Sequence, residues 1–372
     1  MDGVYRSGRG HRRDRRGDDR VPLSAIDSLP FAWGPPPGRA TIAAIPEDFQ
    51  VDERLGFTAE GAGPHLLVRI RKRGLTTMRA IQIIADHWQV DRRGIGYAGR
   101  KDRVAVTTQW LSVPWHVNAA CPAGGMVLAD ETASLEILEI DRHRRKLPVG
   151  ALSGNEFTLT LRDVEASPGA MARRVVTLAR HGVPNYFGRQ RFGRDDNNLV
   201  RARDWFAGTG RPRSRNDRSM LISAARSAMF NAVLAQRVRD GDWRWPRPGD
   251  LLTLDGRGSL FTAETEEALF NRRRAAGLRI HPTGPMPGAE NRGQALSETL
   301  AEREAGVLAE WSPWIESLAS QRVVADRRAL RLSVHGLAAL QLDPATWQLR
   351  FWLTRGAYAT VVLRELVAEA EC

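Results

Sequence analysis

The chain has 372 residues, 42% of them hydrophobic, which is enough to bury two cores. Its 55 Lys and Arg outnumber its 43 Asp and Glu, so the formal net charge is +12 and nucleic acid is the favoured partner, although a basic protein that is merely soluble would show the same balance. Two distant cysteines exclude a disulfide scaffold and a cysteine-based zinc site, and without an uncharged apolar run of about 18 residues no membrane span is expected, so we predict a cytoplasmic location.

The first 20 residues contain seven arginines and four glycines but almost no large apolar side chains. Such a segment cannot bury enough surface to order itself. We therefore predict a disordered basic arm over residues 1–30 that adds non-specific attraction to RNA. A solvated tail or a wrongly chosen start codon explains this composition equally well.

Alternating apolar residues then predict strands over much of the first half, and helical spacing dominates the second half. The expected strands cover residues 42–51, 66–70, 104–110, 135–140 and 156–162, with a helix capped by Thr76 or Thr77 after the second of them. Helical patterns follow at residues 171–179, 221–238, 264–276 and 297–309, then strand patterns at 330–334 and 347–353, then a helix from about Ala357. This order predicts an α+β catalytic domain interrupted by a helix-rich insertion; two sequential domains are the alternative.

The segment Gly99–Arg103, which reads GRKDR, places one carboxylate among three cations. Glycines at 96 and 99 allow a sharp turn, and the cations favour the ionised form of Asp102. An ionised carboxylate suits a nucleophilic or electrostatic role, and the same cations can contact phosphate. On residue type alone, however, a surface ion pair is the better interpretation of an Asp beside Lys or Arg.

The segment Asn185–Gly193, which reads NYFGRQRFG, mixes aromatic rings, amides, guanidinium groups and glycines. Aromatic rings can stack on an unpaired base while neighbouring cations bind its phosphate. A loop at a domain junction, with its rings in the core, fits the same pattern. The two interpretations are compatible, because a junction loop can also line a cleft.

Together the two segments resemble the two signature motifs of the TruD family, the transfer RNA pseudouridine-13 synthases. The first motif spans residues 99–110 (GRKDRVAVTTQW) and the second spans residues 185–193. The resemblance continues in family order from residue 39 onward, through residues 46–53, 143–147, 154–157, 223–231, 256–259, 351–353 and 364–366. The ordered set carries more weight than any single piece.

The resemblance implies an isomerase that converts uridine, at position 13, to pseudouridine with Asp102 as the nucleophile. This reaction breaks the N1–C1′ bond of uridine, rotates the uracil, forms a C5–C1′ bond and releases the C5 proton. It is redox-neutral, so we expect no cofactor and no metal. Whether Asp102 attacks C1′ or removes a 2′ proton to give a glycal stays open. Either route needs an ionised carboxylate against the sugar of an extruded nucleotide.

The resemblance also nominates substrate-binding residues. In the family element Gly-Asn-x-Phe, here residues 154–157, Phe157 is expected to stack on the flipped uracil and Asn155 to make a polar contact near Asp102. Without the resemblance Phe157 would be assigned to the core, because it lies on the apolar face of an alternating strand. The remaining candidates are Tyr358, Glu53, Lys101, Arg103, Asn185, Phe187, Gln190 and Arg191.

Two positions depart from the family pattern. Tyr358 stands where relatives usually carry Phe, which keeps the ring but adds a hydroxyl that the pocket must accommodate. Ala43 stands where relatives often carry a pocket lysine. Arg39, Lys101 or Arg103 could supply the missing cation.

By resemblance the fold is that of pseudouridine synthases, a mixed and mostly antiparallel sheet, interrupted by the family's TRUD domain. We expect the catalytic domain to comprise residues 31–180 and 333–372 and the insertion to span residues 181–332. Transfer RNA is the expected partner; we expect a monomer that requires no protein partner and does not bind membranes.

Two rival functions stay open. A non-catalytic RNA-binding or chaperone protein on the same scaffold would keep the basic charge and the aromatic loop but would not need Asp102. A magnesium-dependent nuclease is weaker, because the acidic residues form no convincing metal-binding set.

Overall fold

The computed structural model describes residues 28–129, 133–291 and 295–370. The predicted basic arm, residues 1–30, therefore lies outside the described residues except for its last three. Among the described residues, no helix has the length and apolar character needed to cross a membrane. The same residues contain no cluster of three His, Cys, Asp or Glu side chains that could hold a metal ion.

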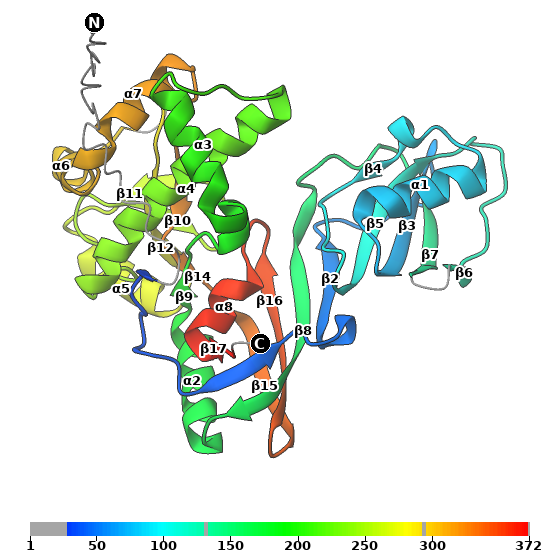
Figure 1. Cartoon of the computed structure of the whole chain (residues 1–372), viewed down its shortest axis with the longest axis horizontal. Coiled ribbons are helices and arrows are strands. Elements are labelled where there is room, and N and C mark those ends of the chain that lie inside the picture. Colours follow the sequence, from blue (N-terminus) through cyan, green and yellow to red (C-terminus); the bar gives the residue numbers. More distant parts are fainter. Residues whose placement is uncertain (1–27, 130–132, 292–294, 371–372) are drawn as a thin grey trace, which may run out of the picture.

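A large mixed sheet of eleven strands forms the centre of the molecule (Figure 1). Its main path runs β15-β16-β8-β2-β5-β3-β7-β6, and only the β2–β5 and β1–β17 pairs are parallel. The strands are β1 (Arg39–Ile42), β2 (Phe49–Leu55), β3 (His65–Arg73), β4 (Gly96–Tyr97), β5 (Val106–Pro114), β6 (Met126–Ala129), β7 (Ser134–His143), β8 (Leu152–Glu165), β15 (His335–Asp343), β16 (Thr346–Thr354) and β17 (Ala368–Glu369). The predicted mixed and mostly antiparallel sheet is thus confirmed.

The two ends of this sheet are covered by different helices. Helix α1 (Thr77–Trp88) packs on the half formed by β3, β5 and β7, and its side chains join a separate hydrophobic core. Helices α2 (Pro168–His181) and α8 (Ala359–Leu366) lie at the other half, beside β15 and β16 (Figure 1). Strand β8 lies between the halves, paired with β2 on one side and with β16 on the other.

The chain between α2 and β15 forms a second unit with its own small sheet. Its four antiparallel strands follow the order β11-β10-β12-β13. They are β10 (Leu251–Leu254), β11 (Leu260–Thr262), β12 (Ile280–Met286) and β13 (Asp326–Ala329), and the helices are α3 (Asn197–Phe206), α4 (Arg215–Arg239), α5 (Ala268–Ala276), α6 (Glu298–Val307) and α7 (Ser312–Ser320). A two-residue ladder, β9 (Val183–Pro184) with β14 (Arg331–Leu332), connects this unit to the large sheet.

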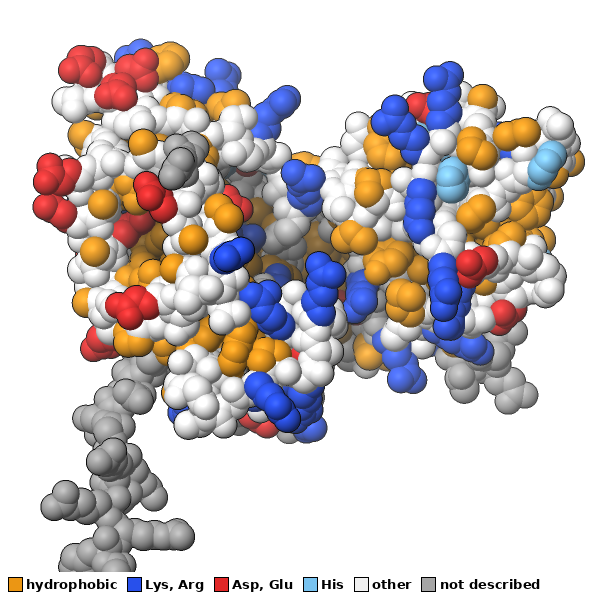
Figure 2. Space-filling model, turned by 90° about the horizontal axis from the view of Figure 1, so that it is seen from above, with side chains coloured by type: hydrophobic (Ala, Val, Ile, Leu, Met, Phe, Trp, Pro, Cys, Tyr) orange, Lys and Arg blue, Asp and Glu red, His pale blue; other side chains and the backbone are white. Residues whose placement is uncertain are grey.

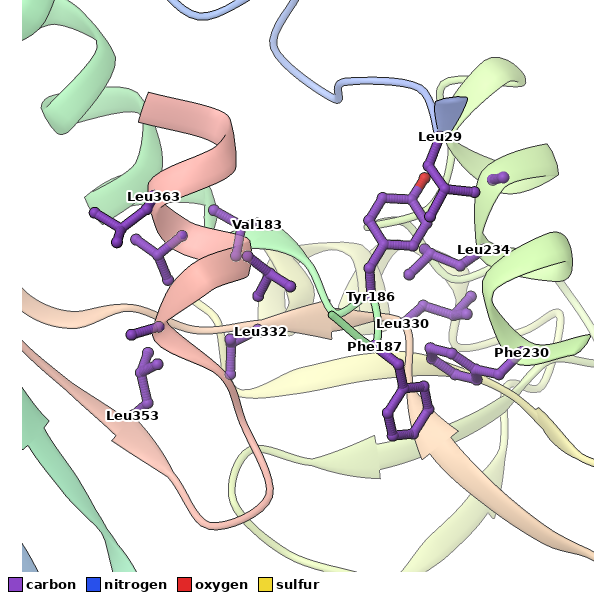
Figure 3. Packing of buried hydrophobic residues seen from close by; sticks show 14 of the residues in the cluster. Leu29, Val183, Tyr186, Phe187, Phe230, Leu234, Leu330, Leu332, Leu353 and Leu363 are labelled. Atoms are coloured by element: carbon purple, nitrogen blue, oxygen red, sulfur yellow. The ribbon is translucent and has the colours of Figure 1, made fainter. Parts of the chain in front are cut away.

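The two units share one hydrophobic core. The cluster extends from Phe157 and Phe351 on the large sheet to Phe230 on α4. In Figure 3, Tyr186 points toward Leu29, whereas Phe187 points the other way, beside Phe230. Because one apolar cluster spans the junction, the insertion packs directly against the large sheet.

Several sequence expectations were wrong in detail. The single strand expected over residues 42–51 is two strands, β1 and β2, because Pro46 begins a 3-10 turn between them. The strand expected from residue 104 begins at Val106, and Val104 is exposed. The strand expected at residues 330–334 is only the two-residue β14.

Candidate active site

The loop that carries Asp102 runs from β4 to β5, so its ends are fixed by neighbouring strands of the large sheet. The Asp102 side chain is exposed. Among the described residues, no hydrogen bond or ion pair engages its carboxylate. The carboxylate is therefore free to contact a bound molecule.

The buried side chain of Lys72 is hydrogen-bonded to the backbone of this loop. The Lys72 ammonium donates to the main-chain oxygens of Asp102 and Leu75, both at 2.7 Å, and Lys72 is 0% exposed. Burial lowers the pKa of Lys72 to about 8, and the negative charge of Asp102 partly opposes this shift. Lys72 is not among the predicted site residues, although it continues the alternation of Leu66, Val68 and Ile70 onto the apolar face of β3.

The start of α1 fixes the neighbouring residue of the loop. The Lys101 amide donates to the Thr77 hydroxyl at 2.9 Å, and that hydroxyl donates to the Gln109 side-chain oxygen at 2.9 Å. Thr77 and Gln109 are both buried. The backbone on the N-terminal side of Asp102 is thus tied to a helix end and to β5.

The Lys101 side chain pairs with Glu53 of β2. Their charged atoms lie 2.5 Å apart, and the side chains are only 8% and 0% exposed. The second Glu53 oxygen accepts the Trp110 amide at 3.1 Å. The Lys101 charge is therefore paired with Glu53. The other two cations near Asp102 are Lys72, which is buried under the loop, and Arg103, which is exposed. The Arg103 Nε donates to the Gly74 oxygen at 3.3 Å.

Asn155 and Phe157 lie on one face of β8, next to the Asp102 loop. Asn155 pairs in register with Glu53 of β2 and with Leu353 of β16. The Asn155 side-chain oxygen is buried and has no hydrogen-bond partner among the residues that the structure describes. The Phe157 ring stacks on Phe351 at 5.3 Å and is only 6% exposed, so most of its surface belongs to the core.

Residues 185–193, called the junction segment from here on, place the Phe187 ring beside two arginines, Arg191 of the same segment and Arg328 of β13. The guanidinium groups of Arg328 and Arg191 lie 4.2 Å and 5.3 Å from the centroid of the Phe187 ring. Arg191 donates to the Ser223 hydroxyl at 2.9 Å and to the Tyr358 hydroxyl. Among described residues neither arginine has a carboxylate partner, so both positive charges are available to an anion.

Asn185 orients Arg328. The Asn185 oxygen accepts from Arg328 at 2.6 Å, and its amide donates to the Ala329 oxygen at 2.8 Å. Burial lowers the pKa of Arg328 to about 10, which leaves the group charged at neutral pH. Arg328 was not singled out by sequence analysis, because its ring partners lie far away in the chain.

Comparison with known proteins decides the family. The family model described as tRNA pseudouridine synthase D (TruD) matches residues 26–201 and 197–366. A tRNA pseudouridine synthase D from Pseudomonas fluorescens (strain Pf0-1) is 43% identical over 343 residues, which cover 91% of this chain and 94% of that protein. The chain belongs to the TruD family.

Two further relatives agree with this assignment. The tRNA pseudouridine synthase D of Nitrosococcus oceani is 42% identical over 347 residues, covering 92% of this chain and 94% of that protein. A crystal structure from Methanosarcina mazei assigned to the same family has a TM-score of 0.69 over 91% of this chain and 95% of that one. At 21% identity this likeness shows the fold, a pseudouridine synthase sheet with its insertion.

The two departures from the TruD pattern have structural explanations. The added hydroxyl of Tyr358 is accommodated, because it accepts from Arg191. Arg39 lies too far from the site to replace the lysine absent at Ala43. It pairs in register with Glu165, which is ten residues along β8 from Asn155. Ten residues of a strand span roughly 33 Å. Lys72 is the ammonium that contacts the Asp102 backbone instead.

This TruD family member has two lobes, one formed by α1 with β3, β5 and β7 and the other by the insertion with α2 and α8, and positive charge surrounds the space between them. Figure 2 shows a hollow there with Lys and Arg side chains around it. Gln190 lies exposed on the short 3-10 turn Arg189–Arg191 within the junction segment. A hollow of this charge attracts the backbone of a nucleic acid.

Proposed function

We propose that this protein converts a uridine of transfer RNA to pseudouridine, with Asp102 as the nucleophile. The observation that carries the proposal is the exposed Asp102 carboxylate, whose backbone is held by buried Lys72 in a chain of the TruD family. Its relatives bear the name tRNA pseudouridine synthase D. The choice of uridine 13 rests on the family resemblance alone.

In the proposed reaction, one carboxylate acts on the ribose of one nucleotide. The N1–C1′ bond breaks, the uracil turns, C5 bonds to C1′, and the C5 proton leaves, so the product is an isomer of the substrate. Asp102 either attacks C1′ or removes the 2′ proton. In both routes, orientation contributes much of the rate, and the main-chain contacts of Lys72 and Thr77 supply that orientation.

The β8 face provides contacts for the extruded base. The unpartnered Asn155 oxygen can accept the N3–H of uracil, since that acceptor is buried and otherwise unsatisfied. Phe157, packed on Phe351, presents only a limited part of its ring, so it supports the base at an edge unless the core shifts. Glu53 and Lys101 form an ion pair beside Asn155, and this pair adds no net charge to the site.

The junction segment binds the RNA backbone in this proposal. Arg191 and Arg328 are free of carboxylate partners among described residues, and Asn185, Phe187, Gln190 and Tyr358 surround them. Arg103 adds a cation beside Asp102. The proposed division is a catalytic domain of residues 31–180 and 333–372 and an insertion of residues 181–332, in a cytoplasmic monomer.

Replacing Asp102 by Asn tests the function directly. The change removes one charge and no volume, so we expect pseudouridine formation on an unmodified transfer RNA transcript to fall by several orders of magnitude. Affinity for that transcript should stay within about threefold, because phosphate contacts dominate binding.

The matched control is Asp86→Asn, which removes another exposed carboxylate, one on α1 that accepts from the Gln82 side chain. It should keep full activity. Full activity of Asp102→Asn would refute the assignment of the nucleophile. A wild-type chain that binds the transcript but never forms pseudouridine would support the non-catalytic alternative.

A further inference from the structure

A polar cavity of about 200 Å³ lies where the insertion meets the end of β16. One wall is the turn Leu254–Gly258 after β10, and another includes Thr354 and Arg355. Gly256 has a φ of +68°, and a Cβ there would lie 3.2 Å from the Thr354 methyl group. Glycine therefore allows the turn to approach β16, and Thr253 fixes it by donating to the Arg257 oxygen at 2.8 Å.

The charges around this cavity are unbalanced. Arg257, Arg328 and Arg355 line it, and none has a carboxylate partner among the described residues. Arg257 and Arg355 are exposed, and the Arg355 guanidinium donates to the Gly150 oxygen at 3.1 Å, its one side-chain hydrogen bond among the described residues. Arg327, which also lines the cavity, is neutralised by Glu304 at 2.5 Å.

The one acidic side chain among the described lining residues has both oxygens engaged. Asp255 contacts His281 at 2.8 Å and His335 at 2.9 Å. The other His281 ring nitrogen accepts from the Arg331 Nε at 2.9 Å, so the proton of a neutral His281 lies on the side facing Asp255. The Asp255 carboxylate is thus engaged by His281 and His335, and it repels a bound anion less than a carboxylate without such contacts would.

We propose that this cavity is a subsite for a phosphodiester group of the RNA strand, one that flanks the nucleotide held at Asp102. These three guanidinium groups, which have no carboxylate partner among the described residues, are suited to phosphate oxygens. The volume exceeds the 150 Å³ or so that holds a benzene-sized group, so one phosphate with part of its sugar fits. The chemistry is shared by inorganic phosphate, and the experiment below distinguishes the two.

The position of the cavity favours an RNA strand. Thr354 pairs with Gly154, the residue before Asn155, and the Arg355 amide donates to the Ser153 oxygen at 3.0 Å. The cavity thus adjoins the strand segment that carries the candidate base contacts. This subsite rests on the proposed function only in assuming that the nucleotide enters at Asp102.

The test is a coupling experiment with the full-length protein. Affinity is measured for transfer RNA transcripts in which single phosphates near the target uridine are replaced by neutral methylphosphonates, using Asp102→Asn protein so that no turnover intervenes. The same affinities are then measured with a double variant, in which Arg257→Gln and Arg355→Gln are added to the Asp102→Asn protein. Arg273→Gln is the control, because Arg273 is exposed on α5 and does not line the cavity.

We expect the double variant to weaken binding about tenfold or more and to lower the salt slope by about one per lost contact. One methylphosphonate position should weaken binding by the otherwise unaltered protein but leave the double variant unaffected. Equal weakening at every position, or a double variant no weaker than Arg273→Gln, would overturn the subsite. Competition by inorganic phosphate without any sensitive linkage would show a small-anion site instead.

These outcomes separate the subsite from the enzyme activity. If wild-type protein forms pseudouridine but no linkage couples to the arginines, the subsite fails and the proposed function stands. If a linkage couples but no pseudouridine forms, the subsite stands and the proposed function fails.

Discussion

At the residue scale, Lys72 should act on the reaction through the position of Asp102. Replacing it by Met removes the donor to the Asp102 and Leu75 oxygens. A small displacement of a reacting group costs on the order of a hundredfold in rate, so we expect kcat/KM to fall about 10- to 100-fold. Lys146→Met, at an exposed lysine, is the control and should leave kcat/KM unchanged. An unchanged rate in Lys72→Met would remove Lys72 from the mechanism.

The pH dependence separates positioning from simple destabilisation. The pKa of Lys72 is about 8 in the folded chain against an ordinary 10.5, so between these values the unfolded chain holds the extra proton. The free energy of unfolding should therefore rise as pH rises from about 8 to 10.5, while kcat/KM declines above about 8 because the charge beneath the Asp102 loop is lost. Single-turnover rates between about pH 6 and 9.5 should show this decline in wild type and not in Lys72→Met.

The parts of the site that sequence analysis predicted lie within short motifs. Asp102 and residues 185–193 became candidates through the resemblance of these short motifs to a family, which needs only residues that are neighbours in the chain. The pairing of Lys101 with Glu53 could not, because the two residues come from different strands and meet only through the sheet register. For the same reason the alternation in β3 indicates that Lys72 is buried, but not that it contacts Asp102.

At the scale of elements, the β8–β16 pair should tolerate no side chain at Gly154. An added Cβ would lie 2.2 Å from the Leu353 oxygen and 2.7 Å from the Trp352 ring. Gly154→Ala must therefore separate the strands next to Asn155, and we expect a loss of about 2 kcal/mol or more in the free energy of unfolding together with reduced activity. Urea unfolding measures the first effect.

Gly306→Ala provides the opposite case. This glycine lies in α6, and a Cβ there meets nothing within 4 Å. Alanine should stabilise the helix by up to about 1 kcal/mol. If Gly154→Ala were as stable as this control, the close approach of β8 and β16 would not constrain the site.

The elements with long regular patterns were predicted best. The helix at α4 and the strand at β8 follow clear periods of 3.6 and 2. The insertion was expected to be helix-rich, and its small sheet β11-β10-β12-β13 was not predicted. Its strands are short, and β12 contains Pro282 and Pro285, which argue against a strand unless tertiary pairing is known.

At the scale of the whole molecule, charge should govern the encounter with RNA. The net charge is +12, and Lys and Arg surround the hollow between the lobes (Figure 2). Each phosphate that a cation neutralises releases condensed counterions, so the logarithm of affinity should fall linearly with the logarithm of salt concentration. With roughly six to ten contacts, affinity falls about 10³- to 10⁵-fold between about 50 and 200 mM salt.

The measurement is a titration of unmodified transfer RNA transcript at several salt concentrations with Asp102→Asn protein. Because the effect comes from the phosphate backbone, a transcript with the target uridine replaced by cytidine should give the same slope even if its affinity differs. A shallow slope would contradict the electrostatic account of the hollow. A slope that depends on the target base would mean that the number of phosphate contacts changes with the base, which this account does not predict.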